Sequence, residues 1–337
     1  MGIKLFKVRA KDIAYLCGAF LLFSSCVGGA KECATEENPV VYADTINFHF
    51  ATIEEGRTLI TTEDNYARNL SKFDIIARLQ NPQGTEVELA DLSVRSLREW
   101  TEEEKEKIKI MMYAINDSIR KNNFRLPLPP TITLVKSTLE EEGGAAGYTR
   151  SNWIALTDRL FTHLPESFHT TLLLHELFHV LTRNSIEFKR EMYATIGFTV
   201  ENQELEYPQD LLNLRISNPD IDKYDSYATF MVDGEAQKCA MILYADKPYT
   251  SGNFFEYMTV GFVPYDEQMM PVQESGKTLI YPMEKIDNFY EKIGKNTSYI
   301  IHPEEILAEN FVIAFTNASS VPTPELKEKI RKILKNK

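Results

Sequence analysis

The spacing of apolar residues predicts a long amphipathic helix in the first half of the chain. Thr101 followed by Glu104 is typical of a capping box, and apolar residues then recur every three or four positions to about Asn122. A weaker helical pattern runs through residues 63–79. Before it, residues 46–53 (INFHFATI) alternate between apolar and polar positions, as strands do. The apolar positions of the long helix are Ile108, Met111, Met112, Ile115 and Ile119.

A second group of elements follows the proline-rich break LPLPP. Residues 131–135 (TITLV) and 152–157 (NWIALT) are typical of strands. Between them, residues 140–147 (EEEGGAAG) predict a mobile loop. A largely apolar helix is expected over 172–183, so the predicted order is helix, strand, loop, strand, helix.

Residues 185–300 mix short strand-like runs with aromatic-rich loops, and no recognisable module stands out among them. The hydrophobic fraction of 43% suffices for a core, and the charged fraction of 26% is ordinary. We therefore expect one α+β domain over residues 43–337, with a long insertion at about 185–300.

The amino-terminal segment has the features of a bacterial lipoprotein signal peptide. Four basic residues within the first eleven positions precede an apolar run over 13–23, which is too short to span a bilayer comfortably. The following Ser-Ser-Cys resembles a lipobox, although Phe23 stands where leucine is usual. We expect residues 1–25 to be removed, Cys26 to carry the lipid at a membrane of the cell envelope, and residues 26–42 to form a flexible tether. The alternative is an ordinary signal peptide with an incidental cysteine.

The net charge limits the kinds of partner that we expect, and the cysteine content limits the disulfides and cysteine zinc ligands that we expect. Removal of residues 1–25 takes away four basic residues and Asp12, which leaves 33 basic and 48 acidic residues and a net charge of −15. Such an acidic protein repels nucleic acid, so a peptide, a protein or a small molecule is the expected partner. Cys33 and Cys239 are too few for a disulfide scaffold, and no cysteine has the spacing of a zinc ligand.

The stretch LLLHELFHVLTR, residues 172–183, places ionisable groups inside the apolar helix. His175 and His179 are four residues apart and share one face of a helix, with Glu176 beside them. Two imidazoles on one face supply half of a tetrahedral zinc site, and Glu176 can take a proton from water at that metal. This is the H-E-x-x-H arrangement of zinc peptidases. Histidines satisfied within the core are the alternative, but three buried ionisable groups are costly unless they are paired or bind a metal.

A third ligand is expected from residues 302–311 (HPEEILAENF). Pro303 suits the first position of a helix, and Glu305 and Glu309 then share one face. The pattern resembles the glutamate helix of the gluzincin metallopeptidases, Glu-x-x-x-Asp. This resemblance implies that Glu305 binds zinc and that Glu309 orients a zinc-bound histidine, with glutamate in place of the usual aspartate.

Two alternatives remain for this segment. Acidic residues in a first turn also complement the helix dipole and need no metal. If Glu305 is not the ligand, Glu187 and Glu191, shortly after the histidine helix, are the next candidates.

The resemblance implies a zincin-like catalytic domain. It has an H-E-x-x-H helix, a second helix that carries the glutamate ligand, and a small mixed sheet whose edge strand pairs with an extended peptide. We assign that edge strand to residues 153–157, with a plain structural strand as the alternative.

The expected function is that of a zinc-dependent metallopeptidase with Zn²⁺ on His175, His179 and Glu305. Glu176 is then the general base. Tyr299 and His302, just upstream of Glu305, are candidate donors to the developing oxyanion, and either residue can equally be structural. Two other functions stay open. One is a non-catalytic zincin-fold binding lipoprotein at the surface or in the periplasm, and the other is a zinc hydrolase of a non-peptide substrate.

Overall fold

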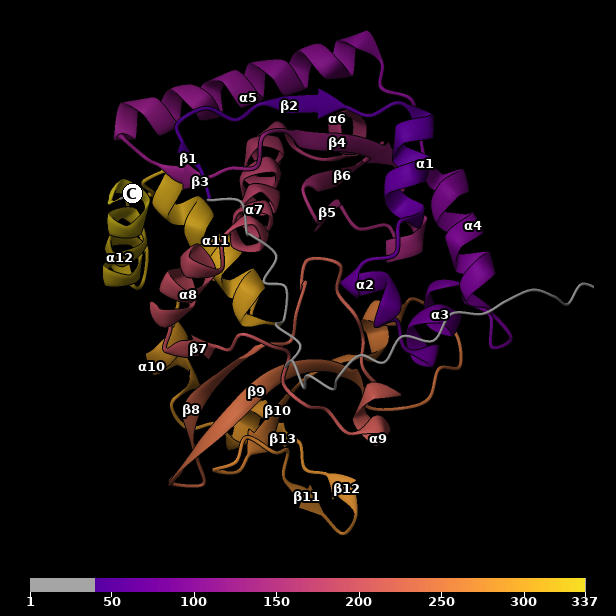
Figure 1. The fold of residues 1–337 in the computed structure, drawn as a ribbon, viewed down its shortest axis with the longest axis vertical. Helices are drawn as coiled ribbons and strands as arrows, with labels where there is room; N and C mark the ends of the chain where they lie inside the picture. The colour runs from indigo at the N-terminus through magenta and orange to yellow at the C-terminus, as the bar shows by residue number, and fades with distance from the viewer. Residues whose placement is uncertain (1–39, 337) are drawn as a thin grey trace, which may run out of the picture. The chain divides into compact units, whose positions relative to one another are not determined.

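The computed structural model describes residues 40–336, and its first layer is built around a four-stranded mixed sheet (Figure 1). The strand order is β2-β4-β6-β5, with β2, β4 and β6 mutually parallel and β5 antiparallel to β6. The strands are β2 (Phe48–Phe50), β4 (Ile132–Ser137), β5 (Gly147–Arg150) and β6 (Trp153–Thr157). The predicted strands near residues 46–53, 131–135 and 152–157 are confirmed.

The edge-strand assignment is wrong. Strand β6 lies inside the sheet, between β4 and β5, and every one of its residues is buried. The two edges are formed by β2 and by β5, and β5 is antiparallel to its neighbour. A strand whose side chains are buried on both faces reads as a continuous apolar run, and WIALT is such a run.

The two faces of this sheet pack against different helices. Side chains alternate along a strand, so Ile154 and Leu156 of β6 join the large core, while Trp153 and Ala155 face the other side. The large core includes the buried residues of α5 (Glu102–Asn122) and α7 (Glu166–Asn184). The opposite face is covered by residues of α1 (Ile53–Thr61) and α4 (Glu86–Ser96).

Helix α5 begins as predicted. The Thr101 hydroxyl accepts the backbone N–H of Glu104 at 3.2 Å, and the Glu104 carboxylate accepts the backbone N–H of Thr101 at 2.9 Å. Asn116 then joins α5 to the segment before β2, because its side chain exchanges two hydrogen bonds with the backbone of Ile46. The weaker helical pattern over residues 63–79 corresponds to α2 (Asn65–Arg68) and α3 (Lys72–Arg78).

The loop predicted over residues 140–147 is more structured than expected. Residues Glu140–Glu142 form a short 3₁₀ helix, and Gly147 already belongs to β5. Glu142 is buried because the Arg78 guanidinium donates to its Oε2, and Tyr66 donates to its other oxygen. The run of glutamates looks exposed in sequence, but its charge is matched by a residue far away in the chain.

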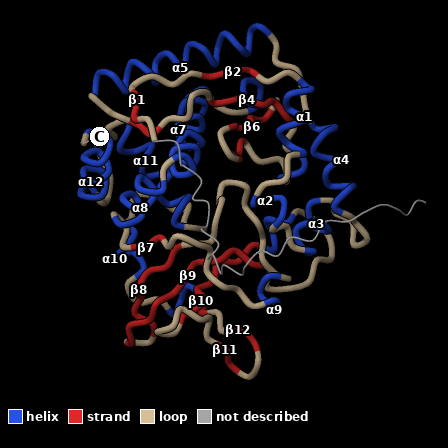
Figure 2. Tube along the Cα trace, in the orientation of Figure 1, coloured by secondary structure: helices blue, strands red, loops and turns tan. Residues whose placement is uncertain are grey.

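Residues 185–300, in which short strand-like runs were expected, contain an antiparallel sheet, whose assembly the sequence pattern did not predict. Its strand order is β13-β10-β9-β8-β7, and all neighbours are antiparallel. Figure 2 shows it as a separate strand layer below the helices α7 and α11. The strands are β7 (Phe198–Val200), β8 (Ser226–Val232), β9 (Glu235–Ala245), β10 (Met258–Tyr265) and β13 (Tyr281–Pro282).

The remaining elements are short strands and short helices, together with the C-terminal helices. Strand β1 (Tyr42–Ala43) pairs with β3 (Leu126–Pro127), so Tyr42 belongs to the fold and not to the predicted tether.

The predicted signal peptide, Cys26 and the tether up to residue 39 lie outside the described residues. No helix in the described part has both the length and the apolar character needed to cross a membrane. The other elements are β11 (Gln273–Glu274), β12 (Lys277–Thr278), α6 (Leu160–His163), α8 (Ile186–Ala194), α9 (Gln209–Leu212), α10 (Phe289–Ile293), α11 (Pro303–Phe315) and α12 (Pro324–Lys335), with 3₁₀ turns at Phe254–Tyr257 and Met283–Lys285.

Candidate metal centre

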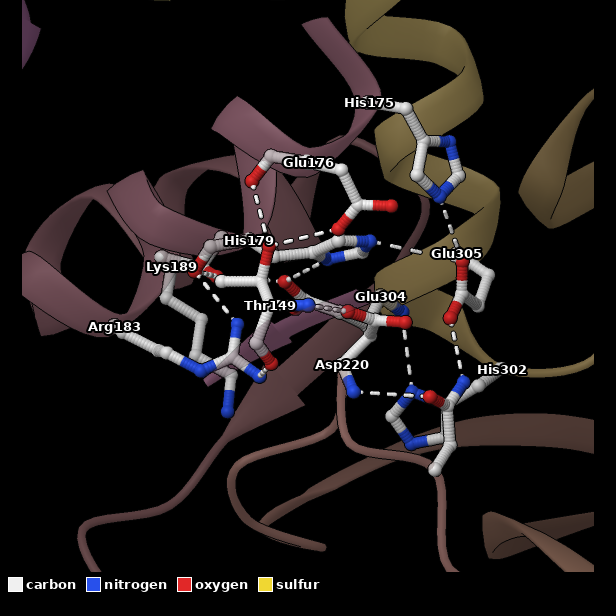
Figure 3. Close-up of polar contacts among 12 residues, drawn as sticks. Thr149, His175, Glu176, His179, Arg183, Lys189, Asp220, His302, Glu304 and Glu305 are labelled. Atoms are coloured by element: carbon white, nitrogen blue, oxygen red, sulfur yellow. Dashed lines mark hydrogen bonds and ion pairs between the residues drawn. The ribbon is translucent and has the colours of Figure 1, made fainter. Parts of the chain in front are cut away.

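Helices α7 and α11 bring the two predicted motifs together. His175, His179 and Glu305 each offer one ligand atom, and these atoms lie within 4.8 Å of one another. His175 Nε2 lies 3.0 Å from Glu305 Oε2, and His179 Nε2 lies 3.7 Å from the same oxygen. Figure 3 shows the two imidazoles and the carboxylate directed toward one point. Glu187 and Glu191 are absent from both possible metal-binding groups among the described residues.

One atom of this cluster has no hydrogen-bonding partner among the described residues. His179 is completely buried, and its Nε2 is one of the few buried side-chain atoms without a hydrogen bond among the described residues. A buried polar atom without a partner costs about 1–3 kcal/mol, so such atoms are rare. A divalent cation at this nitrogen removes that cost. Two imidazole nitrogens and a carboxylate oxygen are the ligand types that zinc prefers, so these residues fit the metal.

Each histidine is oriented by a second carboxylate behind it. His175 Nδ1 lies 3.1 Å from Glu309 Oε1, the position that the gluzincin resemblance implied for Glu309. His179 Nδ1 lies 3.1 Å from Glu304 Oε1, a contact that the sequence did not suggest. Carboxylates in this position fix the tautomer and the ring orientation of metal-binding histidines.

Glu304 is the more deeply buried of the two supporting carboxylates. It is 3% exposed and also accepts hydrogen bonds from Thr182 Oγ1 and the Tyr193 hydroxyl, each at 2.6 Å. Burial opposes its ionisation, but the hydrogen bond from His179 and the nearby positive charges lower the pKa of Glu304 to about 2. It therefore stays a carboxylate at neutral pH. The signal for this contact in the sequence was the pair of adjacent glutamates in PEEILAE, Glu304 and Glu305. Only the packing of α11 against α7 shows that both side chains point toward α7.

The predicted ligand Glu305 is also held from its other side. It is 1% exposed, and Asn218 Nδ2 donates to its Oε1 at 2.6 Å. Burial raises the pKa of Glu305, but the hydrogen bond and charge of the histidines outweigh it, so the pKa is lowered overall. Its second oxygen, Oε2, is the one that faces both imidazoles.

Glu176 lies beside the candidate metal-binding cluster and over the edge strand. Its Oε2 accepts the Thr149 hydroxyl at 2.7 Å, and a Cβ on Gly147 would lie only 2.9 Å from its Oε1. A Cβ at Gly147 would therefore press on the carboxylate of Glu176, which would have to shift. Burial and the neighbouring Asp220 raise the pKa of Glu176 to about 8. Without a metal this carboxyl group therefore keeps its proton at neutral pH, and a cation beside it would favour the charged form that a general base needs.

The two predicted oxyanion donors are placed differently. The Tyr299 ring centroid lies 6.3 Å from that of His175, and nearby Glu305 together with burial raises the pKa of Tyr299 well above its ordinary value. Its hydroxyl therefore stays protonated beside the cluster. It also lines a pocket of about 80 Å³ together with Gly147 and Asp220.

His302 occupies a structural position. It is the N-cap of α11, where its Nδ1 accepts the backbone N–H of Glu304 at 3.2 Å. Its ring packs edge-on against Tyr224, and burial lowers the pKa of His302 to about 3. A neutral imidazole that caps a helix accounts for this residue without a role in catalysis, and Pro303 follows it in the first turn as predicted.

Comparison with family models, with curated proteins and with solved structures found no match to this chain.

Proposed function

We propose that this protein is a zinc-dependent peptidase with a zincin-like catalytic domain. The observation that carries the proposal is the buried, unpartnered Nε2 of His179, which faces the same point as His175 Nε2 and Glu305 Oε2. The antiparallel edge strand β5 lies beside this point, as an extended peptide substrate requires. Bound zinc supplies a Lewis acid that activates water and polarises the scissile carbonyl.

The chain's own residues account for the proton transfers. Glu176 accepts a proton from the attacking water at its free carboxylate oxygen, while Thr149 holds the other oxygen in place. The same carboxylate then passes the proton to the leaving nitrogen. Tyr299 is the preferred donor to the developing oxyanion, because its ring centroid lies 6.3 Å from that of His175 and it lines the pocket beside Gly147.

Zinc content and peptide hydrolysis measured on the same preparation test this proposal. The purified protein should hold one zinc per chain and cleave members of an unbiased peptide library. Glu176→Gln should keep the metal but lose about 10²- to 10⁴-fold in turnover. Zinc binding without cleavage of any peptide would instead favour the non-catalytic binding protein or a hydrolase of another substrate.

The envelope location also remains a proposal. We propose that lipid on Cys26 anchors the mature chain at a membrane. The acidic balance of the chain, with a formal net charge of −12 over its full length, favours a peptide or protein substrate over nucleic acid.

A further inference from the structure

A small pocket lies directly beside the candidate metal centre. Its volume is about 80 Å³. Gly147 lines this pocket, and a Cβ on that residue would lie only 2.9 Å from Glu176 Oε1. Asn218 lines it as well and donates to Glu305 Oε1 at 2.6 Å. A peptide whose scissile bond lies at the metal centre therefore has a neighbouring side chain within reach of the pocket.

The backbone of β5 leads an extended peptide to the same place. Thr149 has its outward N–H bound to Asp220 Oδ1 at 2.6 Å and its carbonyl oxygen bound to Arg183 Nη2 at 3.2 Å. Backbone groups alternate in direction along an antiparallel strand, so those of Gly147 face the same side as those of Thr149. A peptide can therefore pair with β5 at Gly147, which is part of the pocket lining, but not at Thr149.

The wall of the pocket is mostly apolar. Leu243 comes from β9 and Met258 from its neighbour β10, so the antiparallel sheet supplies one part of the wall. Phe254 is buried, whereas Phe255 beside it is 46% exposed. An exposed aromatic side chain beside an apolar pocket is typical of a surface that a ligand covers. The apolar lining residues include Ile216, Leu243, Phe254, Phe255, Met258 and Ile301.

The two phenylalanines are held in place before any ligand binds. Asn253 Nδ2 donates to the Gly143 carbonyl at 3.1 Å, and a Cβ on Gly143 would lie 2.8 Å from Phe254 Cε1 and 3.0 Å from Phe255 Cε2. Phe254 also packs against Arg78, whose Cζ lies 4.6 Å from the ring centroid. A preformed pocket costs little to order on binding, so its shape can select a side chain.

The charged residues of the lining already have partners within the protein. Arg78 donates to Glu142 Oε2 at 3.0 Å and to Asp74 Oδ1 at 2.5 Å. Asp220 is the remaining charged residue of the lining, and its Oδ1 accepts the Thr149 N–H at 2.6 Å. Burial of a charged side chain without a free partner is costly, so the pocket favours an uncharged one.

The size of the pocket limits the choice further. An apolar cavity of about 150 Å³ binds benzene. The volume here is about half of that, so it does not admit an aromatic side chain. The branched aliphatic side chains are smaller and match the apolar wall.

We propose that this is the specificity pocket of the peptidase, and that it takes the side chain of a leucine, isoleucine or valine next to the scissile bond. The inference rests on the proposed peptidase function. It adds the substrate class, which is peptides with a branched aliphatic residue at the cleaved bond.

Mapped cleavage sites test the proposed preference. The zinc-loaded protein is incubated with a library of nonapeptides of random sequence, and the cleaved bonds are located by mass spectrometry. At one of the two positions that flank the cleaved bond, kcat/KM should be about 10- to 100-fold higher for leucine, isoleucine or valine than for glycine. Cleavage without this preference, or with a charged or aromatic residue preferred at both positions, would overturn the inference and leave the peptidase proposal intact. Cleavage of no peptide by protein that holds zinc would reject both.

Met258→Ala enlarges the pocket and should change what it accepts. We expect the ratio of kcat/KM for phenylalanine to that for leucine to rise about tenfold at this position, while zinc content stays the same. The matched control is Met270→Ala, a methionine that is 45% exposed and outside the lining, which should leave the ratio unchanged. An unchanged ratio in Met258→Ala protein that still cleaves peptides would contradict the assignment of the pocket.

Binding gives a readout that does not depend on turnover. The zinc-loaded Glu176→Gln variant is titrated into two peptides that carry a fluorophore at the carboxyl end and differ only in leucine or glycine at the preferred position. Anisotropy should show about 10- to 100-fold tighter binding of the leucine peptide. Phe255→Ala in the same background removes a half-exposed part of the wall, so the fold is retained and the difference should shrink about 3- to 10-fold. Equal affinity for the two peptides before that substitution would refute the inference.

Discussion

Replacement of Glu304 by glutamine tests whether the buried carboxylate behind His179 supports the metal centre. Glutamine has nearly the same size, but it removes the charge and turns one oxygen into a donor. Three donors, from His179, Thr182 and Tyr193, point at Glu304 in the native protein. At least one of them would lose its acceptor in a site that is only 3% exposed. We expect zinc to bind about 10- to 100-fold more weakly, or about 1.4–2.7 kcal/mol.

Glu309→Gln is the matched control, because Glu309 takes the same place behind His175. Its side chain is 35% exposed, so water can replace a lost contact, and we expect less than a tenfold loss. Zinc affinity is measured by competition with a chromophoric chelator of known affinity, and circular dichroism of the metal-free variants checks that both still fold. If Glu309→Gln weakens zinc as much as Glu304→Gln does, burial of the supporting carboxylate does not control metal affinity.

Four further outcomes are expected. Glu305→Ala removes a predicted ligand, so zinc retention and activity should both collapse on dialysis; retention of zinc would place the third ligand elsewhere. Gly147→Ala puts a Cβ at 2.9 Å from Glu176 Oε1, so activity should fall while zinc content, measured by atomic absorption, stays at one per chain. Hydrogen bonds that His175 donates to Glu305 and Glu309 outweigh burial and raise the pKa of His175, so zinc must displace a proton there. Zinc affinity should therefore rise up to about tenfold per pH unit below that pKa, and a chelator titration that is flat between pH 6 and 8 would contradict this. Cys26→Ser should move the protein from the membrane to the soluble fraction; retention in the membrane together with an unlipidated wild-type mass would contradict the lipobox.

Local patterns were enough to predict the elements whose signals are local. The capping box at Thr101 and the helical spacing after it correspond to α5, and the H-E-x-x-H spacing places two imidazoles on one face of α7. These features depend on residues three or four positions apart. No tertiary contact is needed to read them.

The features that the local sequence patterns did not predict depend on contacts between segments that are distant in the chain. The edge strand β5 has only four residues, and its role follows from its pairing with β6, not from its own composition. Asp220 comes close to Glu176 because the segment around it is anchored to Arg183 and Ser217 is bound by Arg78. Nothing in the local sequence NPDI distinguishes that aspartate from one in an exposed turn.

The position of Glu304 follows from the way α7 and α11 run against each other. His175 meets Glu309 and His179 meets Glu304, so the helices must be antiparallel. Four residues of helix rise about 6 Å and five rise about 7.5 Å, so the two histidines and the two outer glutamates span similar lengths. Glu305 then lies between Glu304 and Glu309 along α11, and one of its carboxylate oxygens faces both imidazoles. A shift of α11 by one residue would rotate its side chains by about 100° and remove all three carboxylates from α7. The apolar contact between the two helices, such as that between Phe178 and Phe311 with ring centroids 5.6 Å apart, therefore determines the geometry of the site as much as the three candidate ligands do.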